Sequence, residues 1–199
     1  MMQQRHRCCS PAIGQFAAGI LLLSTIGSAH AQVSASQPLY AGRIDDFRGR
    51  SLEQKVQLLT DREEIRDLIA TYAHRAAHRQ SMADLFTDDG AFINRPDAKA
   101  PPMEMRGRAA IDKFFNGLGS QPQQPLPTIH NFLISVQGDE ARAMSSIEVR
   151  IVNNGRIVDG SGYYQDRFRR ENGRWKFVER DCTFFTMIAQ PAATAKPGG

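Results

Sequence analysis

The chain has 199 residues, of which 41% are hydrophobic and 23% charged, with 11 Phe, 4 Tyr and 1 Trp. This length and composition predict one globular domain with tails, and they exclude wholesale disorder and a pair of full-sized domains. The formal charge of +4 is spread along the chain rather than gathered in one block, so it gives little support to a nucleic-acid or membrane-surface partner.

The first 31 residues have the features of a signal peptide. Arg5 and Arg7 form a short cationic region, an apolar run extends from Ile13 to Ile26, and residues 29–31 give the small-x-small pattern that signal peptidase requires. We expect cleavage after Ala31 and a secreted or periplasmic protein that has no membrane contact after cleavage. A membrane anchor is disfavoured, because the most apolar part of the run is well short of the ~20 residues that a spanning helix needs.

Cleavage would remove two arginines and no acidic residue, which lowers the formal charge from +4 to +2. It would also remove Cys8 and Cys9, so the mature chain, with Cys182 alone, cannot form an intramolecular disulfide. Cys182 lies in an apolar run, which favours a buried structural thiol over a nucleophile. We predict an N-terminal extension at 32–57, a single domain at 58–188 and a flexible tail at 189–199.

The first predicted element of the domain is a helix that starts at Thr60. Thr60 and Glu63 form a capping box, because the threonine side chain can accept from the Glu63 amide while the glutamate side chain reaches back. Apolar residues then recur at helical spacing and predict one stripe that faces the core: Ile65, Leu68, Ile69, Tyr72 and Ala76. Tyr72 is therefore expected to point inward.

Shorter elements follow this helix. The pattern predicts a second short helix at 81–86 and a turn at 88–90 that leads into a strand at 91–94. Three prolines between 96 and 102 mark a loop, and the apolar spacing after them predicts a helix over 107–118.

The rest of the domain is predicted as strand, in runs at 128–136, 142–152, 156–169 and 174–185. The dipeptides between these runs favour tight hairpin turns: Gly138-Asp139, Asn154-Gly155 and Asn172-Gly173. Helices followed by an antiparallel meander indicate an α+β domain. One face of the sheet should pack on the helices, and the other should face water or a second subunit.

Five short segments occur in a characteristic order: 85–90 (Leu-Phe-Thr-Asp-Asp-Gly), His130, 138–141 (Gly-Asp-Glu-Ala), 162–166 (Gly-Tyr-Tyr-Gln-Asp) and 173–177 (Gly-Arg-Trp-Lys-Phe). Together they resemble the SnoaL-like branch of the nuclear transport factor two-like superfamily, over about residues 58–188. The resemblance implies a cone-shaped, strongly bent antiparallel sheet wrapped around N-terminal helices, an apolar pocket and a homodimer. The superfamily includes scytalone dehydratase, ketosteroid isomerase, hexachlorocyclohexane dehydrochlorinase and non-catalytic members, so the fold does not fix the function.

The resemblance is greatest to the dehydratases and dehydrochlorinases, whose pockets pair a histidine on the first long strand with an aspartate near the end of the first helix. His130 matches that histidine, and Arg180 resembles the arginine near the departing anion. The aspartate is missing, because Ala77 or Arg75 stands at its position, depending on the direction of counting. His78, or less readily His74, can fill the gap, but two histidines must share a proton or recruit another acid.

Each candidate residue also has a structural interpretation. His130 alternates with Phe132 and Ile134 on a face that the pattern predicts as buried, so it is either a general base or a satisfied core histidine. His74 and His78 are four residues apart and share one helix face, but the arginines beside them disfavour a metal ion. A solvated helix end is the structural alternative for these two histidines.

The tyrosines and Arg180 leave similar alternatives open. Tyr72 either donates a hydrogen bond to a ligand or packs in the core, and at most one of Tyr163 and Tyr164 can line the same pocket, because neighbours on a strand point to opposite faces. Arg180 either meets an acidic residue such as Asp166 or Glu148, or binds an anion.

The leading hypothesis is an exported, cofactor-independent lyase that performs a dehydratase-type elimination or an enolate isomerisation on a small apolar cyclic or aromatic molecule. His130 would be the general base, with Tyr72, His78 and Arg180 as further catalytic residues. His74, Tyr163, Tyr164 and Phe132 are predicted ligand contacts. No motif for a nucleotide or metal is present in the mature chain. The alternative is a non-catalytic ligand-binding or dimeric assembly module on the same fold.

Overall fold

The computed structural model describes residues 45–97, 99–119, 124–153 and 156–190, which belong to one compact unit. The predictions that lie outside the described residues are the signal peptide, residues 32–44 of the N-terminal extension, the predicted turn at 154–155 and the tail from 191. Two α-helices, α1 (Leu52–His78) and α2 (Arg108–Gly119), and a single 3-10 turn, η1 (Ala83–Leu85), accompany six strands. The strands are β1 (Phe86–Arg95), β2 (Met103–Arg106), β3 (Gln124–Gln137), β4 (Glu140–Asn153), β5 (Arg156–Glu171) and β6 (Arg174–Ala189).

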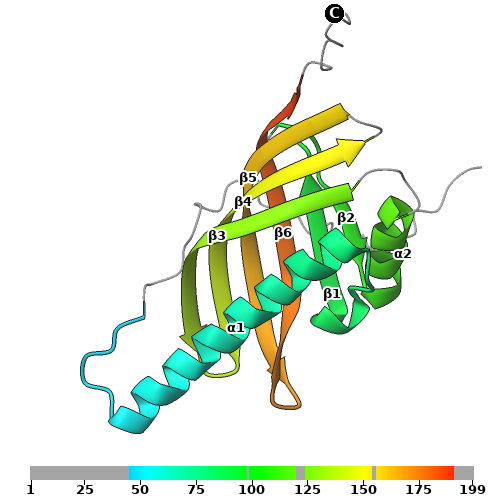
Figure 1. Cartoon of the computed structure of the whole chain (residues 1–199). Helices are drawn as coiled ribbons and strands as arrows, with labels where there is room; N and C mark the ends of the chain where they lie inside the picture. The colour runs from blue at the N-terminus through cyan, green and yellow to red at the C-terminus, as the bar shows by residue number, and fades with distance from the viewer. Residues whose placement is uncertain (1–44, 98, 120–123, 154–155, 191–199) are drawn as a thin grey trace, which may run out of the picture. The chain divides into compact units, whose positions relative to one another are not determined.

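The strands form one sheet in the order β2-β1-β6-β5-β4-β3. Every neighbouring pair is antiparallel except β1 and β6, which run parallel. Figure 1 shows α1 crossing one face of this sheet, with α2 beside β1 and β2. The predicted α+β class, single domain and β3–β6 meander are therefore confirmed, whereas strand β2 and the parallel pairing of β1 were not predicted. Neither described helix is long and apolar enough to cross a membrane.

Helix α1 begins eight residues earlier than predicted. Its capping box is formed by Ser51 and Gln54, because the Ser51 side chain accepts from the Gln54 amide and the Gln54 side chain accepts from the Ser51 amide. Leu58, in the added turns, is buried in the core and extends the apolar stripe toward the N-terminus. The prediction of a start at Thr60 was wrong because the sequence contains two capping boxes, and the earlier one begins the helix.

The sheet bends where strands carry irregularities. The register between β5 and β6 shifts between Ser161 and Gly162. A Cβ atom at Gly162 would lie 2.1 Å from the Thr183 carbonyl oxygen, so only glycine permits this close approach of the two strands. In β1, residues 88–90 belong to the strand rather than to the predicted turn, and the register with β6 shifts across this segment.

A second irregularity, in β3, decides which residues face the core. The register between β3 and β4 shifts between His130 and Leu133, and Asn131 has a φ of 56°. Before the shift, Ile129 pairs with the buried Ile147, and His130 pairs with Ser146. Because paired residues share a face, His130 lies on the outer face of the sheet, away from the helices. The prediction that His130 faces the core was therefore wrong.

Candidate ligand-binding site

A cavity of about 250 Å³ lies between the helices and the inner face of the sheet. Its walls are mainly apolar and come from distant parts of the chain, such as Phe115 of α2, Ile147 and Val149 of β4, and Phe184 of β6. Pro125 and Pro127 of β3 also line it. Ligand sites are commonly concave, largely apolar and equipped with a few polar groups, so this cavity is the candidate site.

The most buried part of the cavity wall contains two tyrosines and a thiol. Tyr72 of α1, Tyr164 of β5 and Cys182 of β6 line the cavity, and each is at most 3% exposed. The two phenol rings meet edge to face with their centroids 5.9 Å apart. The predicted inward orientation of Tyr72 is confirmed.

A fully buried ion pair lies against these tyrosines. The Nη1 atom of Arg180 donates to the Oδ2 atom of Asp166 at 3.0 Å, and neither side chain is exposed. The guanidinium carbon lies 3.6 Å from the ring centroid of Tyr164 and 4.1 Å from that of Tyr72. Of the two alternatives for Arg180, an acidic partner or a bound anion, the structure shows the acidic partner. Arg180 is not among the described residues that line the cavity.

Burial controls the protonation of this cluster. Loss of water raises the pKa of both tyrosine hydroxyls, although the nearby Arg180 cation opposes the rise. Burial raises the pKa of the Cys182 thiol to about 12, and that of the Asp166 carboxyl to about 7 although Arg180 opposes it. At neutral pH the cavity therefore presents protonated hydroxyls and a thiol, which donate hydrogen bonds and do not act as bases.

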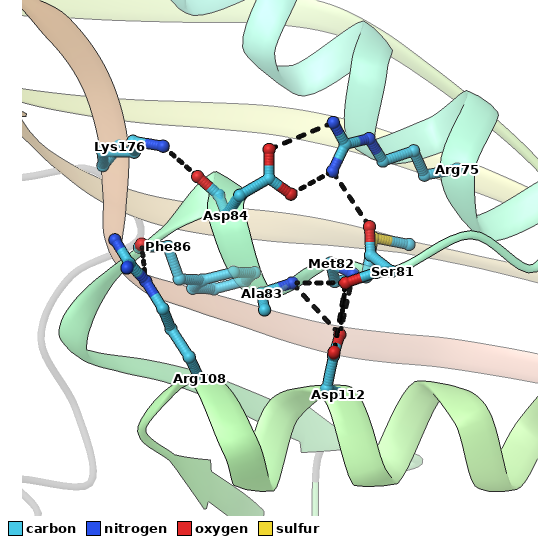
Figure 2. Close-up of polar contacts among 9 residues, drawn as sticks. All are labelled: Arg75, Ser81, Met82, Ala83, Asp84, Phe86, Arg108, Asp112 and Lys176. Carbon is cyan, nitrogen blue, oxygen red and sulfur yellow. Dashed lines mark hydrogen bonds and ion pairs between the residues drawn. The ribbon is translucent and has the colours of Figure 1, made fainter.

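The connection between α1 and β1 is fixed beside the cavity by a polar network (Figure 2). The Arg75 guanidinium bonds both oxygens of Asp84 and donates to the Ser81 carbonyl oxygen. From α2, the Asp112 carboxylate accepts from the Ser81 hydroxyl and from the amides of Met82 and Ala83. These bonds hold the fully buried Met82 against the cavity, which Arg75 also lines.

His130 lies outside this site. Its Nε2 atom is 3.9 Å from the Oε1 atom of Glu148 on the outer face, and 39% of its side chain is exposed. It is not among the described cavity-lining residues, and neither are His74 and His78, which are exposed on α1. The structure therefore does not bring the three predicted histidines together with Tyr72. Their catalytic roles stay predictions.

The remaining predicted contacts divide between the two faces of the sheet. Tyr164 lines the cavity, whereas Tyr163 is half-buried and stacks on Phe185 with ring centroids 5.1 Å apart. Tyr163 pairs with Ser146, which places it on the outer face with His130. Phe132 packs against the core, but it is not among the described lining residues.

One contribution was missed from the sequence, which is the place of Cys182 in the cavity wall. Asp166 follows Tyr164 by two residues, and Cys182 follows Arg180 by two, so strand alternation could have grouped all four on the inner face. Among the described residues, no group of three His, Cys, Asp or Glu side chains could hold a metal ion.

Comparisons with known proteins agree with this architecture. No curated protein matches the chain. The chain is similar to a crystal structure from Novosphingobium aromaticivorans assigned as an aromatic ring hydroxylase, with 25% identity, a TM-score of 0.59, and coverage of 66% of this chain and 94% of the other. A second structure from that organism, assigned as a scytalone dehydratase, has 20% identity and a TM-score of 0.58, with 69% and 97% covered.

A hexachlorocyclohexane dehydrochlorinase has 16% identity and a TM-score of 0.60, with 72% of this chain and 99% of that chain covered. Its likeness and that of the dehydratase concern the fold alone. The family model described as a SnoaL-like domain matches residues 57–181. Since this match spans more than half of the chain, the protein belongs to the SnoaL-like domain family.

Proposed function

We propose that the protein binds a small, mainly apolar molecule in the cavity, with a polar oxygen of the ligand at the hydroxyls of Tyr72 and Tyr164. The observation that carries this proposal is the contrast within the cavity, whose walls are apolar except for a few polar groups. An apolar ligand gains free energy by leaving water for such walls, and a hydroxyl at the buried end orients it.

The geometry favours binding over proton abstraction. Among the described residues that line the cavity there is no Asp, Glu or His, and the pKa of the Cys182 thiol is raised to about 12. A general base must reach the proton that it removes directly or through one water molecule, and it works best with a pKa near the working pH. The non-catalytic binding module is therefore the function that the site supports best.

A lyase or isomerase is the second candidate, and the tyrosine pair favours it. Protonated hydroxyls at a buried site can stabilise negative charge that develops on a substrate oxygen. Solved structures with this fold include proteins assigned as a dehydratase and a dehydrochlorinase. The predicted base His130 lies on the outer face of the sheet, away from the cavity, so its catalytic role is a separate prediction with its own test: replacing a true base should lower turnover by about 10²-fold or more. A fivefold or smaller change in His130→Ala would contradict that role.

Binding is tested with a neutral fluorescent probe, N-phenyl-1-naphthylamine, whose emission rises in apolar surroundings. We expect saturable binding to the wild-type protein and at least about a tenfold weaker affinity for Ile151→Trp, which fills the cavity with a larger side chain. Leu133→Trp is the matched control, because Leu133 is an exposed residue of β3 with an outward-facing partner in Met144. Equal affinity in all three proteins would contradict binding in the cavity.

We also propose that the protein is exported and forms a homodimer through the outer face of the sheet. Leu133, Phe185 and Ile188 are large apolar side chains on β3 and β6 that are 43–63% exposed, and burying them would favour association. Light scattering is expected to give twice the chain mass, and a monomer at high concentration would refute the dimer. N-terminal sequencing of the exported protein is expected to begin at Gln32.

A further inference from the structure

Arg180 occupies a position that stability alone does not explain. Its side chain is completely buried and makes one hydrogen bond to Asp166. Within the described part of the chain, the Nε and Nη2 atoms of Arg180 and the Oδ1 atom of Asp166 have no hydrogen-bond partner. Replacing such a buried ion pair by apolar residues is often neutral or stabilising, because the pair loses its hydration free energy on burial. The gain in stability therefore does not account for a buried ion pair at this position.

The position of the guanidinium group connects it to the ligand site. It lies over the faces of Tyr164 and Tyr72, at 3.6 and 4.1 Å from the ring centroids. The same two tyrosines line the cavity, whereas Arg180 does not. A ligand would therefore touch the tyrosines on one side while the cation touches them on another, so any effect of Arg180 on the ligand passes through the two phenol groups.

The tyrosine hydroxyls are hydrogen-bond donors on the wall of the cavity. Burial raises the pKa of both hydroxyls, so each keeps its hydrogen at neutral pH. Each hydroxyl can then donate that hydrogen to an acceptor atom in the cavity. A cation over an aromatic ring attracts its electron density, which makes the hydroxyl a stronger donor.

We propose that Arg180 is a positioning residue that polarises Tyr72 and Tyr164, so that the cavity selects a ligand whose buried oxygen is a strong acceptor, such as a phenolate, an enolate or a carbonyl oxygen. This inference rests on the proposed function, because it names the polar group of the ligand bound in the same cavity. Asp166 and Cys182 are the other titratable groups beside the tyrosines, and the Asp166 carboxylate compensates part of the Arg180 charge.

The test uses 4-nitrophenol, a single-ring probe whose phenolate absorbs visible light and whose bound protonation state can therefore be titrated. The reference is the double variant Asp166→Leu/Arg180→Met, which removes both charges together and leaves neither buried alone. We expect the bound probe to favour the phenolate about tenfold more in the wild-type protein than in this variant, which is a pKa difference of about one unit. The neutral pair Asp166→Asn/Arg180→Gln, measured in parallel, should behave like the first variant.

Two further variants test whether a change in the phenolate preference comes from polarisation of the tyrosines or from the loss of any charged pair. Tyr72→Phe keeps the ring and removes the hydroxyl, so it should also lose the phenolate preference. Arg95→Met/Asp181→Leu removes the other Arg–Asp pair of strand β6, whose side chains are partly exposed, and should leave the preference unchanged.

The outcomes distinguish this inference from the proposed function. If 4-nitrophenol displaces N-phenyl-1-naphthylamine but titrates identically in the wild-type protein and both neutral-pair variants, Arg180 does not polarise the site and the inference is overturned while the binding function stands. If neither probe binds the wild-type protein, the binding function itself fails. Circular dichroism of each variant confirms that it is folded before it is titrated.

Discussion

Strand β6 carries two Arg–Asp pairs at consecutive positions, and they lie in opposite environments. Arg180 pairs with Asp166 in the core, where both side chains are 0% exposed, through one bond of 3.0 Å. Asp181 pairs with Arg95 on the outer face, where the side chains are 20% and 24% exposed, through three bonds of 2.9–3.1 Å. The outer pair therefore makes more hydrogen bonds, whereas the inner pair is shielded from solvent.

The comparison shows that two pairs of the same residue types, Arg and Asp, differ in protonation and in role because they differ in burial. Burial raises the pKa of Asp166 to about 7, so the inner pair is easily disturbed by protonation. On the outer face, hydrogen bonding to Asp181 raises the pKa of Arg95 and holds the pair ionised. The outer pair joins strands β1 and β6, whereas the inner pair places a cation against the tyrosines of the cavity.

The largest effect is expected from breaking the inner pair. Arg180→Met leaves the Asp166 carboxyl buried without its partner, and we expect the free energy of unfolding to fall by about 3–5 kcal/mol. Urea denaturation followed by circular dichroism measures this loss. The double variant Asp166→Leu/Arg180→Met should recover most of it, and a loss as large as that of the single variant would show that Arg180 stabilises the core by packing alone.

The second expected effect is on pH dependence. Since the pKa of Asp166 rises from 3.8 to about 7 on folding, the native state holds this proton more tightly than the unfolded state does. The resulting stabilisation is fully present below pH 3.8 and is lost as the pH rises through about 7. The stability of the wild-type protein relative to the double variant should therefore decline between about pH 4 and pH 8. A difference that stays constant over this range would contradict the raised pKa.

A smaller effect is expected for the outer pair. Arg95→Met/Asp181→Leu should change the free energy of unfolding by no more than about 1 kcal/mol, because both side chains are partly hydrated. The loss should shrink further at high salt, which screens exposed charges. A loss above about 3 kcal/mol would mean that the outer pair is a core element like the inner one.

The smallest effect is expected at His130. Its contact with Glu148 is long and exposed, so His130→Ala should change stability by about 0.5 kcal/mol or less and leave probe affinity within about twofold. Fluorescence titration with N-phenyl-1-naphthylamine measures the affinity. A large loss of affinity would indicate that His130 contacts the ligand and would support its predicted role as general base.

Strong local signals made much of the fold predictable. The Asn172-Gly173 turn has φ angles of 51° and 76°, which the dipeptide accommodates readily, and the inward orientation of Tyr72 follows from helical spacing. The pairing of Arg180 with Asp166 was foreseeable because a buried arginine needs an acid.

The orientation of His130 was not predictable in the same way. Alternation along a strand assumes an unbroken period of two, and the irregularity at Asn131 inserts one extra residue into that count, which exchanges the two faces. Only the tolerance of asparagine for a positive φ marks the position, and asparagine is common in many other contexts. The lack of carboxylates in the described cavity wall depends on tertiary packing, which no local pattern contains.

The unusual features of β3 also affect how the protein meets other chains, because β3 is an edge strand of the sheet. Pro125 and Pro127 have no amide hydrogen, and the irregularity at Asn131 interrupts the ladder. Farther along, the Asp45 carboxylate accepts from the Val136 amide, and Arg62 donates to the Ile134 carbonyl oxygen. An incoming strand would find few groups to pair with on this edge, so these features, two of which (Pro125 and Pro127) also line the cavity, disfavour amyloid-like aggregation through β3.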